Sequence, residues 1–221
     1  MKKIQYLLVM VAISTVGFIQ GCTDDDTVTP TVYVTSIKTD MKPDSTEKWL
    51  YYSFDTETTI AATDSSTDKW DIKFRFIPYD VTPAGIGKLI SIFQKDGPIY
   101  LNSPIVGNPS GKTKGYIVDS AFVNVSYAGE DSKFISDDTA NATRIISTNL
   151  SGNGYFIYSG PPNHTLGINP SKTLMIRTKG GKYVKMQLKS IYQGAPDVPT
   201  QASVFGYYSF QYVKSDTKTL K

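Results

Sequence analysis

The chain has 221 residues, of which 40% are hydrophobic and 19% are charged, and its formal net charge is +3. This hydrophobic content excludes an intrinsically disordered chain, and the small net charge gives no indication of a nucleic-acid partner. The 15 Tyr and 10 Phe residues favour strands over helices. Without residues 1–21 the 23 basic residues fall to 21, against 20 acidic ones, a balance of +1.

The N-terminus has the pattern of a bacterial lipoprotein signal. Lys2 and Lys3 precede an apolar run that ends at Ile-Gln-Gly-Cys22. A charged start, a short apolar middle and small residues before a cleavage site predict a secretory signal and not a membrane span. The last four residues resemble a lipobox, whose cysteine is acylated with fatty acids such as palmitate. We therefore predict a signal peptide over residues 1–21 and a lipid anchor on Cys22. The alternative is an ordinary secretory signal with a chance cysteine.

An acidic cluster follows the predicted acylation site. Asp24, Asp25 and Asp26 resemble a surface-export signal of Gram-negative outer-membrane lipoproteins, and a solvated linker is compatible with the same residues. We expect residues 22–30 to form a tether and residues 31–221 to form one β domain.

Strand-like segments recur along the rest of the chain. Many short strands separated by turn signals predict a mainly antiparallel all-β domain with few or no helices. The segment Lys88–Gln94 could be a strand or a short helix, and Arg144–Leu150 could be a strand or a helical turn. The expected strands are Val32–Ile37, Trp49–Phe54, Lys69–Ile77, Tyr116–Tyr127 (as two strands or one with a bulge), Tyr155–Tyr158, Thr173–Arg177, Lys182–Ser190 and Phe205–Lys214.

The stretch 152–192 combines the clearest of these signals. Two strand runs bracket Lys179-Gly180-Gly181, a hairpin signal because Gly supplies the positive φ of a tight turn. In Lys182–Ser190 the apolar residues alternate with Lys185, Gln187 and Lys189, which predicts one buried face and one exposed face. The loop Ser159–Ser171 holds the only histidine of the chain, His164.

Three groups of motifs resemble the HmuY family of haem-binding bacterial lipoproteins. They are the aromatic strands WLYYSF and KWDIKFRF, the strands and loop of the 152–192 stretch, and the closing strand FGYYSFQY. The resemblance covers roughly residues 30 to 215 in order. It implies a mainly β-sheet fold that holds haem at one end. It also implies iron acquisition at the outer-membrane surface, with delivery of the haem to a TonB-dependent transporter.

The resemblance also implies two axial ligands, both His or both Met, on two loops. Here one position corresponds to Gly160, and the other falls in the loop Gly129–Asp138, which contains neither His nor Met. Neither ligand therefore carries over. His164 lies four residues after Gly160 and is our main ligand candidate, the alternative being an exposed loop histidine without a role.

Three further residues are candidate ligands. The sulfur of Met175 and the phenolates of Tyr158 and Tyr127 are groups that bind haem iron. For each of them, a purely structural role is the alternative interpretation.

Catalysis is not expected. A serine triad would need His164 on a loop without a nucleophile elbow, Cys22 is the lipid site, and metal-binding spacings are absent from the sequence. Two functions remain open: a haem-binding surface lipoprotein, and a surface module that uses the same scaffold to bind a glycan, a peptide or a partner protein. The sequences Asp119-Ser120-Ala121 and Asp138-Thr139-Ala140 also resemble acceptors of bacterial O-glycosylation.

Overall fold

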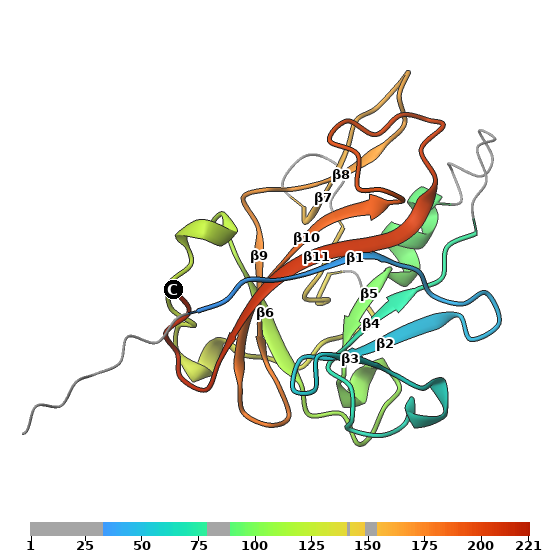
Figure 1. Ribbon diagram of the computed structural model, residues 1–221. Helices are drawn as coiled ribbons and strands as arrows, with labels where there is room; N and C mark the ends of the chain where they lie inside the picture. Colours follow the sequence, from blue (N-terminus) through green and yellow to red (C-terminus); the bar gives the residue numbers. More distant parts are fainter. Residues whose placement is uncertain (1–32, 79–88, 141, 149–153) are drawn as a thin grey trace, which may run out of the picture. The chain divides into compact units, whose positions relative to one another are not determined.

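The computed structural model describes residues 33–78, 89–140, 142–148 and 154–221 (Figure 1). These residues belong to one compact unit, Val32–Lys221. The predicted signal peptide, Cys22 and the tether lie outside the described residues. Within the described ranges, no helix has both the length and the apolar character needed to cross a membrane.

The described residues form three antiparallel sheets, which confirms the predicted all-β class. One sheet has five strands in the order β1-β11-β10-β9-β6, a second has four in the order β3-β2-β4-β5, and β7 pairs with β8. The strands are β1 Ser36–Met41, β2 Trp49–Ser53, β3 Thr58–Ile60, β4 Ile72–Arg75, β5 Ile99–Leu101, β6 Lys114–Val118, β7 Phe156–Tyr158, β8 Leu166–Ile168, β9 Thr173–Arg177, β10 Tyr183–Tyr192 and β11 Phe205–Ser215.

Helical structure in the described residues is short, as predicted. A single helical turn over residues 89–91 continues into the π-helix η2, Ile92–Asp96, so the segment that the sequence left open is helical from residue 89 onward. The 3-10 turns are η1 Ala62–Asp64, η3 Pro104–Val106, η4 Phe122–Asn124 and η5 Asp131–Lys133.

The first hydrophobic core lies between the four-stranded and five-stranded sheets. The strand β4 lies within the predicted Lys69–Ile77 strand, and its Ile72 and Phe74 point into this core. Phe74 stacks on Phe210 of β11 with ring centroids 5.4 Å apart, and Phe54 meets Tyr212 edge to face at 5.0 Å. Full burial of each large apolar side chain contributes roughly 1.5–3 kcal/mol, so this aromatic contact holds the two sheets together.

A second core covers the other face of the five-stranded sheet, and it corrects one prediction. Lys185 and Gln187 were expected on an exposed face of β10, yet both are buried. The turn η4 covers Lys185, whose ammonium donates hydrogen bonds to the carbonyls of Phe122 at 3.2 Å and Val125 at 2.7 Å. Burial lowers the pKa of Lys185. The alternation correctly separated two faces, but the second face is covered at Lys185 and Gln187, and only Lys189 is exposed as predicted.

Other boundaries differ from the predictions. The N-terminal strand β1 begins at Ser36, near the end of the predicted Val32–Ile37 segment, and continues to Met41, because it follows its pairing with β11. The Tyr116–Tyr127 segment gives the single strand β6, and its second half turns into η4 over the second core. The segment Ser159–Ser171, expected to be a loop, contains the short strand β8, which was not predicted from the sequence.

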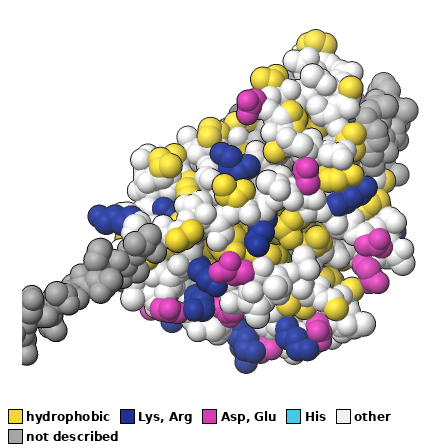
Figure 2. Space-filling view, viewed as in Figure 1, with side chains coloured by type: hydrophobic (Ala, Val, Ile, Leu, Met, Phe, Trp, Pro, Cys, Tyr) yellow, Lys and Arg dark blue, Asp and Glu magenta, His cyan; other side chains and the backbone are white. Residues whose placement is uncertain are grey.

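The predicted hairpin turn between β9 and β10 is confirmed. Gly181 has φ of 83°, a left-handed conformation that favours Gly. The Asp55 carboxylate braces this turn by accepting hydrogen bonds from the Thr178 hydroxyl at 2.9 Å and from the Gly180 N–H at 3.2 Å. The face in Figure 2 shows basic and acidic side chains mixed together, as the near-neutral charge balance would suggest.

Candidate functional site

The β7–β8 hairpin carries the main ligand candidate. Tyr158 of β7 pairs with Leu166 of β8 across the antiparallel ladder. The hairpin packs on the C-terminal half of β10, where the Leu166 N–H donates to the Tyr192 hydroxyl at 2.9 Å and the Leu188 N–H donates to the Tyr155 hydroxyl at 3.1 Å. These two hydrogen bonds hold the hairpin against β10, and the loop between β7 and β8 contains His164 (Figure 1).

The loop itself is closed by main-chain and hydroxyl hydrogen bonds. The His164 N–H donates to the Gly160 carbonyl at 2.8 Å, and the Ser159 N–H donates to the Thr165 carbonyl at 2.9 Å. The Thr165 N–H in turn donates to the Ser159 hydroxyl at 2.9 Å. His164 has φ of 48°, a left-handed conformation that is uncommon for a residue other than Gly. The hydrogen bonds that close the loop hold His164 in this strained backbone conformation.

Two of the sequence candidates meet in this loop. The hydroxyl of Tyr158 and Nδ1 of His164 are hydrogen-bond partners, and their ring centroids lie 5.9 Å apart. Both side chains are half-buried. Among the described residues, Nε2 of His164 has no hydrogen-bond partner. An imidazole whose Nδ1 is held by a neighbour while Nε2 remains available is a common arrangement for a metal-binding histidine.

This pairing could not be seen in the sequence because β8 was not predicted. With residues 159–171 taken as one loop, the six-residue separation of Tyr158 and His164 carried no meaning. Because Tyr158 pairs with Leu166, the loop between them turns back toward Tyr158. His164 therefore lies close enough to form a hydrogen bond with the Tyr158 hydroxyl.

The other two candidates lie elsewhere. Met175 is 0% exposed and is part of the second core. Tyr127 is 52% exposed and bridges to Thr219 near the C-terminus of the chain. Neither contacts the Tyr158–His164 pair. Met186 of β10 is buried in the first core.

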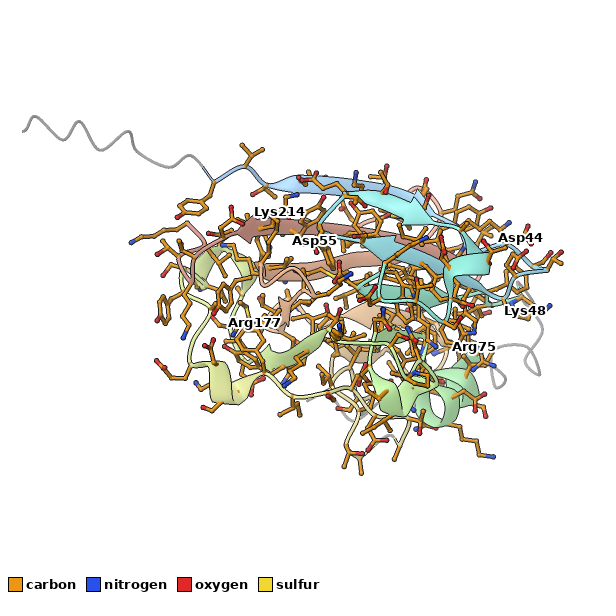
Figure 3. The ribbon with its side chains drawn as sticks, turned by 90° about the horizontal axis from the view of Figure 1, so that it is seen from below. Asp44, Lys48, Asp55, Arg75, Arg177 and Lys214 are labelled. Carbon is orange, nitrogen blue, oxygen red and sulfur yellow. The ribbon has the colours of Figure 1, made fainter. Side chains whose placement is uncertain are left out.

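The loop Gly129–Asp138 lies at the opposite end of β10 from His164. Its Asp131 accepts a hydrogen bond from the Tyr183 hydroxyl at 2.8 Å and pairs with Arg177 at 3.0 Å (Figure 3 labels Arg177). Tyr183 begins β10, whereas Tyr192, which holds the hairpin, ends it. Ten strand residues span roughly 30 Å. Asp131 in this loop therefore lies far from His164.

A buried carboxylate explains the fold of that second loop. Asp137 is 0% exposed and accepts hydrogen bonds from the N–H groups of Leu101 at 2.8 Å, Asp138 at 2.9 Å and Ile145 at 3.0 Å. Burial raises the pKa of Asp137, while these donors oppose the change. The loop is thus a folded part of the scaffold. Within the described ranges, no group of three or more His, Cys, Asp or Glu residues could hold a metal ion.

Comparison with known proteins identifies the family. The family model described as HmuY protein matches residues 45–212. The chain belongs to the HmuY family. The match includes β2, β4, the β7–β8 hairpin and β10, which are the segments that carry the sequence resemblance.

Solved structures similar to this chain include other proteins of the HmuY type. The apo HmuY analog of Tannerella forsythia is 11% identical to this chain, with a TM-score of 0.47. The match covers 84% of this chain and 97% of that chain. Apo PinO from Porphyromonas gingivitis is 10% identical, with a TM-score of 0.43 and coverage of 82% and 98%. A protein from Bacteroides fragilis described as a candidate lipoprotein is 14% identical, with a TM-score of 0.39 and coverage of 81% and 89%. No curated protein matches the chain.

Proposed function

We propose that this HmuY-family chain is a haem-binding surface lipoprotein in which Nε2 of His164 ligates the haem iron. Acylated Cys22 anchors it in the outer membrane, and a TonB-dependent transporter receives the haem. The protein acts by binding and transfer and not by catalysis. Membership of a haem-binding family supports this proposal, and the Tyr158–His164 pair is the structural observation that carries it.

The residues of the loop fit a haem ligand in their chemistry. Imidazole nitrogen is a common axial ligand of haem iron, and a neutral imidazole can ligate only through a nitrogen that bears no proton. If Nδ1 of His164 keeps its proton and donates it to the Tyr158 hydroxyl, Nε2 is that nitrogen. The hydrogen bond also fixes the orientation of the ring. Bound haem supplies the iron, and this chain supplies the donor atom and its placement.

The backbone position of Gly160, the family ligand position, is open around its Cα atom. A Cβ atom built on Gly160 would have no heavy atom within 4 Å, although its φ of 70° favours Gly. The loop thus combines an unfilled position at Gly160 with one held donor at His164.

A hemin titration of protein made without a polyhistidine tag tests the proposal. We expect a saturating Soret shift at one equivalent for the wild type and its loss in His164→Asn, since Asn tolerates the left-handed backbone but lacks the imidazole. Removal of the positioning hydroxyl in Tyr158→Phe should weaken hemin binding about 10-fold or more. The exposed neighbour Asn163→Ala should bind as the wild type does.

Two results would contradict the assignment. His164→Asn that is folded by circular dichroism and still binds hemin as tightly as the wild type would remove His164 as ligand. Loss of binding in Tyr158→Phe together with full binding in His164→Asn would identify Tyr158 as the ligand through a tyrosinate bond.

A further inference from the structure

A second candidate site lies on the outer face of the four-stranded sheet. It is a cavity of about 400 Å³, within the size range of small-molecule sites. Its walls share no residue with the β7–β8 loop. Those that matter here are Trp49, Lys73, Arg75, Lys95, Asp96 and Tyr100.

The strand pairing explains why these side chains face one cavity. Trp49 of β2 lies directly opposite Arg75 of β4, and Lys73 of β4 lies opposite Tyr100 of β5. Paired residues in an antiparallel sheet point to the same face, and residues two apart along a strand do so as well. Since Ile72 and Phe74 fill the core, the alternate residues Lys73 and Arg75 must face outward.

Lys73 is a half-buried cation surrounded by aromatic rings. Its Nζ lies 4.6 Å from the ring centroid of Trp49, 5.6 Å from that of Tyr100 and 5.7 Å from that of Trp70. It donates one hydrogen bond, to the Val106 carbonyl at 3.3 Å. Across the described ranges, no carboxylate lies within ion-pair distance of Lys73.

The charge of the cavity is therefore positive. Arg75 pairs with Asp96 at 3.3 Å, and both side chains are partly exposed to solvent, so that pair is weak. Lys95 is exposed and, in the part of the chain that the structure describes, has no ion-pair partner. Lys48, which neighbours Arg75 in an adjoining hollow and lies near the same end of the view in Figure 3, adds another positive charge.

The aromatic rings and one hydrogen bond leave the half-buried Lys73 ammonium without an opposite charge. Cation–π contacts contribute about 0.5–2 kcal/mol, whereas a buried ammonium normally needs an opposite charge as well as hydrogen bonds. Burial accordingly lowers the pKa of Lys73, and the charge of the more distant Asp137 opposes this. An anion in the cavity would provide the missing partner.

We propose that this cavity binds a small molecule that carries a carboxylate on a ring. Lys73 and Arg75 contact the carboxylate, Lys95 adds long-range attraction, and the rings of Trp49 and Tyr100 line the ring of the ligand. Acidic sugars and aromatic acids share this chemistry. The site goes beyond haem binding and does not depend on His164.

Calorimetric titration of the whole protein with matched pairs of probes tests the proposal. Glucuronic acid is compared with glucose, and benzoate is compared with benzyl alcohol. We expect at least one acid to bind at least 10-fold more tightly than its uncharged partner, with an affinity that falls as salt is added. The pair that shows this difference distinguishes an acidic sugar from an aromatic acid.

Variants locate the binding in the cavity. Lys73→Met keeps the length of the side chain and should weaken binding of the acid at least 10-fold, and Lys95→Met, at an exposed position, should weaken it about 3-fold. Lys69→Met serves as the control, because Lys69 pairs with Asp64 at 2.8 Å outside the cavity. Three results would overturn the proposal. They are equal binding of an acid and its uncharged partner, no binding of either acid, and wild-type binding of the acid by both Lys73→Met and Lys95→Met. Hemin binding by Lys73→Met should be unchanged, and its loss would show that the cavity is not a separate site.

Discussion

Replacement of Asp71 by Asn should stabilise the protein at neutral pH and remove part of its pH dependence. Asp71 is 2% exposed, and burial raises the pKa of its carboxyl from 3.8 to about 6. The carboxylate accepts hydrogen bonds from the Phe54 N–H at 2.8 Å and from the Thr113 hydroxyl at 3.0 Å. Asn can keep both contacts, because its oxygen accepts from Phe54 while its amide donates to the Thr113 oxygen.

The size and sign of the effect follow from proton binding. Below about pH 3 the carboxyl is protonated in both states. Between about pH 4 and pH 6 the folded chain keeps the proton that the unfolded chain has released, so the free energy of unfolding falls as the pH rises. At about 1.4 kcal/mol per pKa unit, the difference between 3.8 and about 6 corresponds to about 3 kcal/mol. Above about pH 6 that loss is complete.

Urea unfolding monitored by tryptophan fluorescence at pH 4, 5, 6 and 7 measures this term. The free energy of unfolding of Asp71→Asn, relative to the wild type, should increase by about 2 kcal/mol from pH 4 to pH 7. The exposed Asp197→Asn should show a constant small difference across the same range. A difference between Asp71→Asn and wild type that does not vary with pH would refute the reasoning.

Three further predictions concern packing and the ligand loop. Lys185→Met should lower the free energy of unfolding by about 1–3 kcal/mol, because two buried carbonyls lose their donor; unchanged urea unfolding would contradict this. Gly115→Ala should destabilise the fold by about 2 kcal/mol or more, since its Cβ would lie 2.6 Å from the main-chain oxygen of Met175. The control Gly167→Ala, whose Cβ would lie 3.8 Å from its nearest atom, should change the free energy of unfolding by about 0.5 kcal/mol or less. Gly160→His should add an iron ligand beside His164 and tighten hemin binding; a titration identical to that of the wild type would show that the two positions do not serve one iron.

The sequence predicted the strands best where their residue types agreed with their burial. Thr173–Arg177 was predicted with the bounds that the structure has, because a run of apolar residues ends at a Gly turn. Lys185 was misplaced because alternation distinguishes the two faces of a strand but does not say whether η4 covers one of them. The strand β5 was missed because it has only three residues between turns.

The candidate site was less predictable than the fold because it depends on tertiary contacts. The sequence identified His164 as the only histidine, but its contact with Tyr158 follows from the short strand β8. The separation of the Gly129–Asp138 loop from that histidine follows from which end of β10 each loop contacts. The cavity beside Lys73 likewise needed the register of β2, β4 and β5.

The most direct test of haem ligation uses the single histidine of the chain. Protein without a polyhistidine tag is produced with 15N-labelled histidine, loaded with ferric hemin, and studied by pulsed electron paramagnetic resonance. Because every labelled imidazole is then His164, ligation by its Nε2 predicts that the label changes the nitrogen hyperfine coupling to the iron. A tight hemin complex whose hyperfine spectrum is the same with and without the label would contradict it.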